Sequence, residues 1–162
     1  IDAGSVAPAF GYYTLVPAGS ALNISVASAS VGAPATPLVA GSDMTLLVYG
    51  DAASPTATLL TDDNRPPTDT TTIKMRLING VTGAAGALTL TANNALVASR
   101  VAPGTASTPV AVLGSTNAMN LTVTSSNAPG TFLSNTGTIF NSGGVYTVLV
   151  DGDASAPGML IQ

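Results

Sequence analysis

An internal repeat is the feature of this 162-residue sequence that most constrains its fold. Three pairs of segments match in the same order: Val6–Pro8 with Val101–Pro103, Leu22–Val26 with Met119–Val123, and Thr45–Pro55 with Thr147–Pro157. The offset between the copies grows from 95 to 97 to 102 residues along the chain, as expected when loops change in length and strands do not. Because repeated segments fold into repeated structure, we expect two related units.

The repeated segments have the pattern of short β-strands. In Leu22–Val26 every second residue is apolar, and Met119–Val123 alternates in the same way, which is typical of a strand with one buried face. No window shows the apolar i, i+3, i+4, i+7 stripe of a helix. The predicted strands are Gly11–Val16, Ala21–Ala27, Met44–Gly50, Thr56–Leu60, Ile73–Ile78, Ala87–Thr91, Ala95–Ala98, Thr108–Leu113, Met119–Thr124, Gly137–Phe140, Val145–Val150 and Gly158–Ile161. Many short strands between turn signals predict an all-β fold of two tandem immunoglobulin-like antiparallel β-sandwich units.

A polar segment separates the two copies. Residues 62–72 contain the acidic pair Asp62-Asp63, the pair Pro66-Pro67 and a run of threonines, which predicts a linker that is semi-rigid around the prolines. We therefore expect a first repeat over residues 1–61, a linker over 62–72 and a second repeat over 73–162.

The first copy is shorter than the second. At an offset of 95, Ile1 corresponds to Leu96, so residues 73–95 of the second copy have no counterpart in the first. A sandwich without the two predicted strands in that segment would leave a sheet edge and part of its core uncovered. Three explanations stand open: the sequence is a piece of a longer protein, another subunit supplies the missing strands, or the first copy closes as a smaller sheet packed against the second.

Composition favours a location outside the cytoplasm. Hydrophobic residues make up 46% of the chain and charged residues 7%, yet apolar runs such as Leu46–Tyr49 are far below the roughly 20 residues of a membrane-spanning helix. Lys and Arg number only four and the net charge is −4, which argues against nucleic acid as a partner. Such Lys-poor chains are typical of bacterial secreted and cell-surface proteins. The sequence starts at Ile1 without a Met or a leader peptide, so we expect a processed chain or a fragment.

The sequence offers little for catalysis. It contains no His and no Cys, which excludes Ser-His-Asp and Cys-His catalysis and zinc sites built on these residues. All eight acidic residues are Asp, and the close pairs are Asp62 with Asp63 and Asp151 with Asp153. Turn formation is the favoured role of these pairs; a Ca²⁺ site and paired-carboxylate hydrolysis are the alternatives. We expect no catalytic residue and no cofactor.

Four short segments resemble the bacterial domain-of-unknown-function 4397 family. They are Met75–Gly80, like the family's opening strand and turn, and Val101–Ser107, Val16–Ser20 and Asp62–Pro67, like three later segments of its pattern. The family comprises secreted or lipid-anchored β-sandwich domains that often occur in tandem. The turn Gly80–Gly86 departs from the Ser-Pro-Asp-Ala-Pro turn of the family. Since the shared motifs are turns and strands, the resemblance implies the fold and assigns no catalytic residue.

Taken with the incomplete first copy, these features predict a non-enzymatic extracellular or cell-surface structural or interaction module. Its expected partners are proteins, including further copies of the chain, joined by β-strand complementation in a filament or matrix. The alternative is a carbohydrate- or peptide-binding accessory module of a larger secreted protein. Aromatic residues make up only 4% of the chain, which weakens the case for glycan binding.

Overall fold

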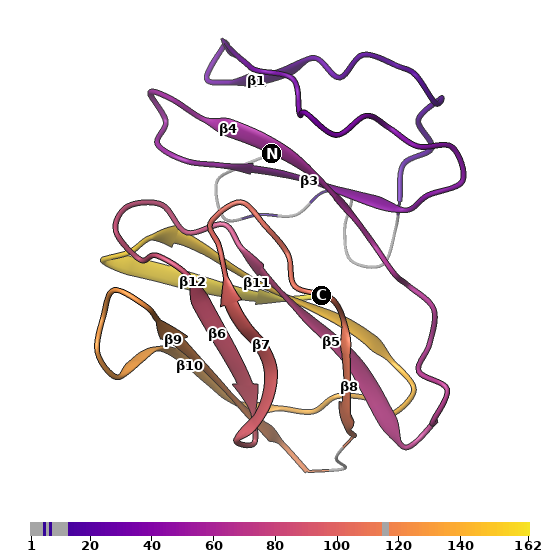
Figure 1. Ribbon diagram of the computed structural model, residues 1–162, viewed down its shortest axis with the longest axis vertical. Coiled ribbons are helices and arrows are strands. Elements are labelled where there is room, and N and C mark those ends of the chain that lie inside the picture. Colours follow the sequence, from indigo (N-terminus) through magenta and orange to yellow (C-terminus); the bar gives the residue numbers. More distant parts are fainter. Residues whose placement is uncertain (1–4, 6, 8–12, 115–116) are drawn as a thin grey trace.

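The computed structural model describes residues 5, 7, 13–114 and 117–162. These residues form twelve β-strands and no helix (Figure 1), so the all-β prediction is confirmed. The strands are β1 (Ile24–Val26), β2 (Ala29–Val31), β3 (Met44–Tyr49), β4 (Thr56–Thr61), β5 (Thr72–Asn79), β6 (Leu88–Ala92), β7 (Ala95–Val101), β8 (Val110–Leu113), β9 (Met119–Ser125), β10 (Thr131–Thr138), β11 (Val145–Asp153) and β12 (Ala156–Ile161). No helix long and apolar enough to cross a membrane occurs in this part of the chain.

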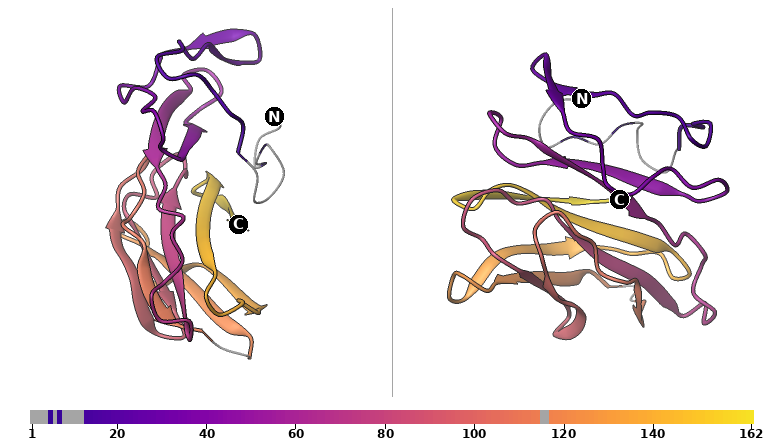
Figure 2. Two further views of the ribbon diagram at one scale, coloured as in Figure 1. Left: turned by 90° about the vertical axis from the view of Figure 1, so that its right-hand side faces the viewer. Right: turned by 45° about the horizontal axis from the view of Figure 1, so that its top comes forward.

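Strands β5 to β12 build two four-stranded sheets that share one core, which we call the two-sheet unit. The strand orders are β10-β9-β6-β7 and β12-β11-β5-β8, and Figure 2 shows the two sheets face to face. All neighbouring strands run antiparallel except β5 and β11, which are parallel. The fully buried core residues include Ile73, Met75, Leu77, Leu88, Leu90, Leu121, Val123, Val148 and Val150. This arrangement is consistent with a β-sandwich.

A buried amide fixes the end of β5. Asn79 is fully buried, and its Nδ2 donates to the carbonyl oxygens of Gly86 at 3.1 Å and Val101 at 3.0 Å. Its Oδ1 accepts the backbone N–H of Val81 at 3.2 Å. One side chain thus ties the loop after β5 to the end of β7, and its polar groups are satisfied away from water.

The β3–β4 hairpin covers the outer face of the sheet that contains β5. Arg76 and Ile78 point away from the core of the two-sheet unit, yet they are only 6% and 2% exposed. Leu47 and Leu60 of the hairpin form a second apolar cluster with Ile78. Tyr49 packs so closely on Gly104 that a side chain at position 104 would collide with the tyrosine ring. Part of the first copy, the β3–β4 hairpin, therefore packs as a two-stranded sheet against the second.

The pairing of the two matched hairpins supports the repeat. Leu46 lies opposite Leu59, and 102 residues later Val148 lies opposite Ile161. The other paired residues that the two hairpins share are likewise offset by 102 residues in both strands. The second match diverges, because β1 turns into β2 through Ala27 and Ser28, both at positive φ, as in a tight type I′ hairpin. The counterpart β9 instead reaches β10 across residues 126–130.

Some predicted strands are wrong. Residues 13–16 form no strand, whereas residues 11 and 12 of that prediction lie outside the described residues, as do Val6 and Pro8 of the first match. Strand β2 was not predicted. Strand β10 occupies Thr131–Thr138 in place of the predicted Gly137–Phe140, and Phe140 is instead a buried core residue in edge-to-face contact with Tyr146.

Candidate functional site

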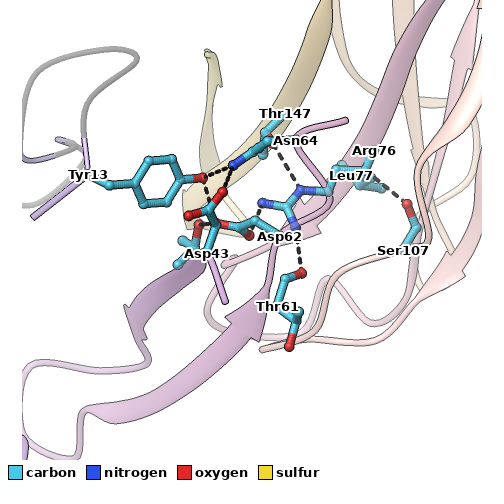
Figure 3. Close-up of polar contacts among 10 residues, drawn as sticks. Tyr13, Asp43, Thr61, Asp62, Asn64, Arg76, Leu77, Ser107 and Thr147 are labelled. Atoms are coloured by element: carbon cyan, nitrogen blue, oxygen red, sulfur yellow. Dashed lines mark hydrogen bonds and ion pairs between the residues drawn. The ribbon is translucent and has the colours of Figure 1, made fainter. Parts of the chain in front are cut away.

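A buried ion pair lies at the junction of the two copies (Figure 3). Asp62 directly follows β4, and its Oδ1 lies 2.6 Å from Nη2 of Arg76 on β5. The two side chains are only 1% and 8% exposed. Arg76 also donates from Nε to Oγ1 of Thr147 at 2.9 Å and from Nη1 to the carbonyl of Thr61 at 3.1 Å. The guanidinium therefore joins β4, β5 and β11 through charge-assisted hydrogen bonds.

The second carboxylate oxygen of Asp62 extends this cluster toward the first copy. Oδ2 accepts hydrogen bonds from Oγ1 of Thr45 at 2.7 Å and from the hydroxyl of Tyr13 at 2.8 Å. Asn64 donates to the Tyr13 hydroxyl and to Oδ2 of Asp43, both at 2.9 Å, as Figure 3 shows. Burial raises the pKa of Tyr13 above its ordinary value, so the phenol stays protonated and remains a donor.

The neighbouring carboxylate, Asp63, also holds cations. Its oxygens lie 2.7 Å from Nε of Arg65 and 2.8 Å from Nζ of Lys74. The hydrogen bonds from Arg65 and then Lys74 hold the pKa of Asp63 well below its usual range. Both members of the predicted Asp62-Asp63 pair thus anchor the start of the linker to β5, which is a structural role.

The other candidate pair lies in the β11–β12 hairpin. Asp153 accepts hydrogen bonds from the backbone N–H and the hydroxyl of Ser155 at 2.9 and 2.6 Å. These bonds, the hydroxyl first, lower the pKa of Asp153, as in a turn capped by its own side chain. Asp151 lies on β11 opposite Gly158. Over residues 13–114 and 117–162 we find no group of three or more acidic side chains close enough to share a metal ion.

One face of the β3–β4 hairpin is partly uncovered along β3, and we call this β3 side the open face; Leu59 and Ala57, which lie opposite Leu46 and Val48 on β4, are buried. Leu46 and Val48 are each 40% exposed on this face. Their repeat equivalents, Val148 and Val150, are fully buried in the core of the two-sheet unit. These two positions of the repeat are thus core in one copy and partly exposed in the other.

Within the described residues, the edge of β3 that faces away from β4 has no strand paired to it. The N–H of Asp62 donates to the carbonyl of Asp43 at 2.9 Å. In an antiparallel pair, hydrogen-bonded and non-hydrogen-bonded residue pairs alternate, so this bond shows which residues of β3 are hydrogen-bonded to β4. Hence Thr45 and Leu47 direct their backbone groups to β4, whereas Met44, Leu46 and Val48 direct theirs away from it. Among the described residues β3 pairs with β4 alone. The sequence indicated that strands were missing, but the exposed edge could be located only once the pairing was known.

Two shallow clefts flank Pro109, and neither brings together catalytic groups. One, of about 350 Å³, lies between the end of β4 and residues 105–109. The other, of about 440 Å³, lies between Pro66, Pro67 and the outer side of β5 and β8. Its one carboxylate, Asp69, accepts hydrogen bonds from Thr71 that lower the pKa of Asp69.

No protein-family model matches the chain, and no curated protein matches it. The resemblance to the domain-of-unknown-function 4397 family therefore stays a prediction.

Proposed function

We propose that the chain is a non-enzymatic extracellular or cell-surface module made of two tandem immunoglobulin-like repeats. In this proposal the first repeat is an incomplete sandwich that joins other molecules by β-strand complementation. The observation that carries it is the contrast between exposed Leu46 and Val48 and their buried equivalents Val148 and Val150. An apolar face that forms a core in one repeat is suited to forming a core with a partner in the other.

The sequence of β3 supports an edge that is kept available. Soluble proteins protect edge strands with charges, prolines, bulges or short length. Other edge strands here carry such features: β10 has two register shifts, β8 has four residues and β12 contains Pro157. Strand β3 reads Met-Thr-Leu-Leu-Val-Tyr and has none of them; its partner β4, which reads Thr-Ala-Thr-Leu-Leu-Thr, also has none.

The acidic residues support the absence of catalysis in this proposal. Asp62 and Asp63 bind arginine and lysine side chains of the same chain, and Asp153 caps a turn. A catalytic pair of carboxylates would need a cleft with room for a substrate between them.

Self-association tests the proposal. The open edges of two copies can pair with each other, so light scattering across a concentration series is expected to show oligomers. Changing both Leu46 and Val48 to Lys places charges on the open face and is expected to weaken association by more than about tenfold. Leu96→Lys, at a 59% exposed leucine on β7, is the matched control and should associate like the wild type. A chain that stays monomeric at its highest soluble concentration contradicts pairing between two copies through this edge.

A stability comparison of repeat-equivalent positions tests its structural basis. Val148→Ala is expected to lower the free energy of unfolding by about 2–3 kcal/mol, because it leaves a cavity in a closed core. Leu46→Ala, at the equivalent position of the open face, is expected to lower it by less than about 1 kcal/mol although it removes more atoms. Urea denaturation of dilute protein measures both. Equal losses would show that the first repeat is already closed.

A further inference from the structure

We propose that the open edge of β3 accepts a parallel β-strand with the residue pattern of β5, supplied by another polypeptide. This inference rests on the function proposed above and names the chemistry of the partner. Its basis is that the second repeat shows which strand occupies the equivalent edge.

Strand β11 is the template for the pairing. On one side β11 pairs with β12 in the register that β3 shares with β4. On its other side β11 pairs in parallel with β5, from Val145 opposite Lys74 to Val150 opposite Asn79. Gly80 closes this ladder by donating its N–H to the carbonyl of Val150 at 2.8 Å. The repeat equivalents of Val145–Val150, 102 positions earlier, are residues 43–48. In this segment the backbone groups of Met44, Leu46 and Val48 point away from β4 and, within the described residues, are free to form the equivalent parallel ladder.

The side chains of a β5-type strand suit this edge. Met75 and Leu77 face the core beside Tyr146 and Val148, so equivalent donor residues would lie beside Met44 and Leu46 and extend the open face. The donor residue at the position of Lys74 would lie opposite Asp43, where β11 has the uncharged Val145. Opposite charges placed directly across two strands stabilise the pair.

A folded second copy does not provide the donor from its own β5. Ile73, Met75 and Leu77 of that strand are fully buried, and withdrawing it would dismantle the two-sheet unit. The donor is therefore a segment of the same pattern that is not already part of a closed sheet. This distinguishes the inference from simple edge-to-edge association of two copies.

A synthetic peptide with the sequence of residues 71–80, added to the intact chain, provides the test. Amide hydrogen exchange followed by NMR is expected to slow about tenfold or more at Met44, Leu46 and Val48. The amides of Thr45 and Leu47 already face β4, so their exchange should not change. This alternation would not arise if the peptide merely stabilised the whole protein.

Variants of the peptide and of the chain, and a spin label, sharpen the test. A peptide with Leu77→Asp and a chain with Leu46→Lys should each lose the protection, whereas a chain with Leu96→Lys should keep it. A peptide with Lys74→Glu should bind severalfold more weakly, because it places a second carboxylate opposite Asp43. A spin label on the peptide N-terminus should broaden Met44 more than Val48, since the strands run parallel.

The outcomes separate this inference from the function on which it rests. Absence of protection, equal protection at Thr45 and Leu47, or stronger broadening at Val48 would overturn the inference. If the chain still self-associates in that case, the proposed function stands and only the identity of the partner strand is wrong. If neither self-association nor peptide binding occurs, both fail.

Discussion

Replacing Asp62 with alanine is expected to lower the free energy of unfolding by about 3–5 kcal/mol, because it leaves the buried guanidinium of Arg76 without a counter-charge. The loss also removes the acceptor for Thr45 and Tyr13, so the β3–β4 hairpin should separate from β5. Denaturation by guanidinium chloride measures the stability. Limited proteolysis should show earlier cleavage within residues 13–61.

Two variants control for this interpretation. The double variant Asp62→Leu with Arg76→Met is expected to be more stable than either single variant, because replacing a whole buried pair by apolar groups is often close to neutral. Asp63→Ala is the matched neighbour, since Asp63 is itself 30% exposed and its partners Arg65 and Lys74 are 86% and 18% exposed, and it should lower the free energy of unfolding by much less than Asp62→Ala does. An Asp62→Ala variant as stable as Asp63→Ala would contradict the role assigned to the buried pair.

Changing Asn79 to leucine is expected to destabilise the chain by at least about 3 kcal/mol. It leaves the carbonyls of Gly86 and Val101 and the N–H of Val81 without partners in the core, and each such group costs about 1–3 kcal/mol. Thermal unfolding followed by circular dichroism measures the effect. Asn120→Leu, at an exposed asparagine of β9, is the control and should change stability by no more than about 0.5 kcal/mol.

An aspartate at position 79 tests the same network through its charge. The carboxylate of Asn79→Asp would face two carbonyl oxygens, so its pKa in the folded state should rise above that in the unfolded state. A group whose pKa is higher in the folded state than in the unfolded state contributes to stability most fully at pH values below its unfolded-state pKa. This contribution is lost as pH rises through the folded-state pKa. Relative to the wild type, the variant should therefore be least stable at neutral pH and recover as pH falls. A pH-independent difference would show that the network is not closed around the side chain.

The alternating pattern predicted the strands that have one buried face. Residues Met119–Thr124 lie within β9, which has one buried face. The matched segments Thr45–Pro55 and Thr147–Pro157 lie in two hairpins that have the same register. Strand β10 was misplaced because its sequence, Thr-Phe-Leu-Ser-Asn-Thr-Gly-Thr, is mostly polar. As a bulged edge strand, β10 is defined mainly by its backbone hydrogen bonds to β9. Its sequence therefore does not show the alternation of apolar and polar residues by which a strand is predicted.

The site was less predictable because its partners come from distant parts of the chain. Asp62 and Asp63 were identified from the sequence as a close acidic pair. Their arginine and lysine partners could not be predicted, because they depend on how the β3–β4 hairpin packs on β5. One signal was present in the sequence. In β5 the apolar residues Ile73, Met75 and Leu77 share one face, and Ile78 lies on the other with Arg76. A strand with apolar residues on both faces is usually covered on both, which could have predicted a layer outside the sheet.

The parallel pairing of β5 with β11 also sets an order for folding. These strands are separated by the whole of β6 to β10, so their contacts cannot form until β11 has been synthesised. The β3–β4 hairpin, in contrast, closes over residues 50–55 and can form early. During synthesis its residues emerge before the sheet on which it packs, so the apolar face that contacts Ile78 is exposed to other nascent chains until that sheet forms. Production of this protein should therefore be most vulnerable to misassembly in the interval between the emergence of β4 and that of β11 from the ribosome.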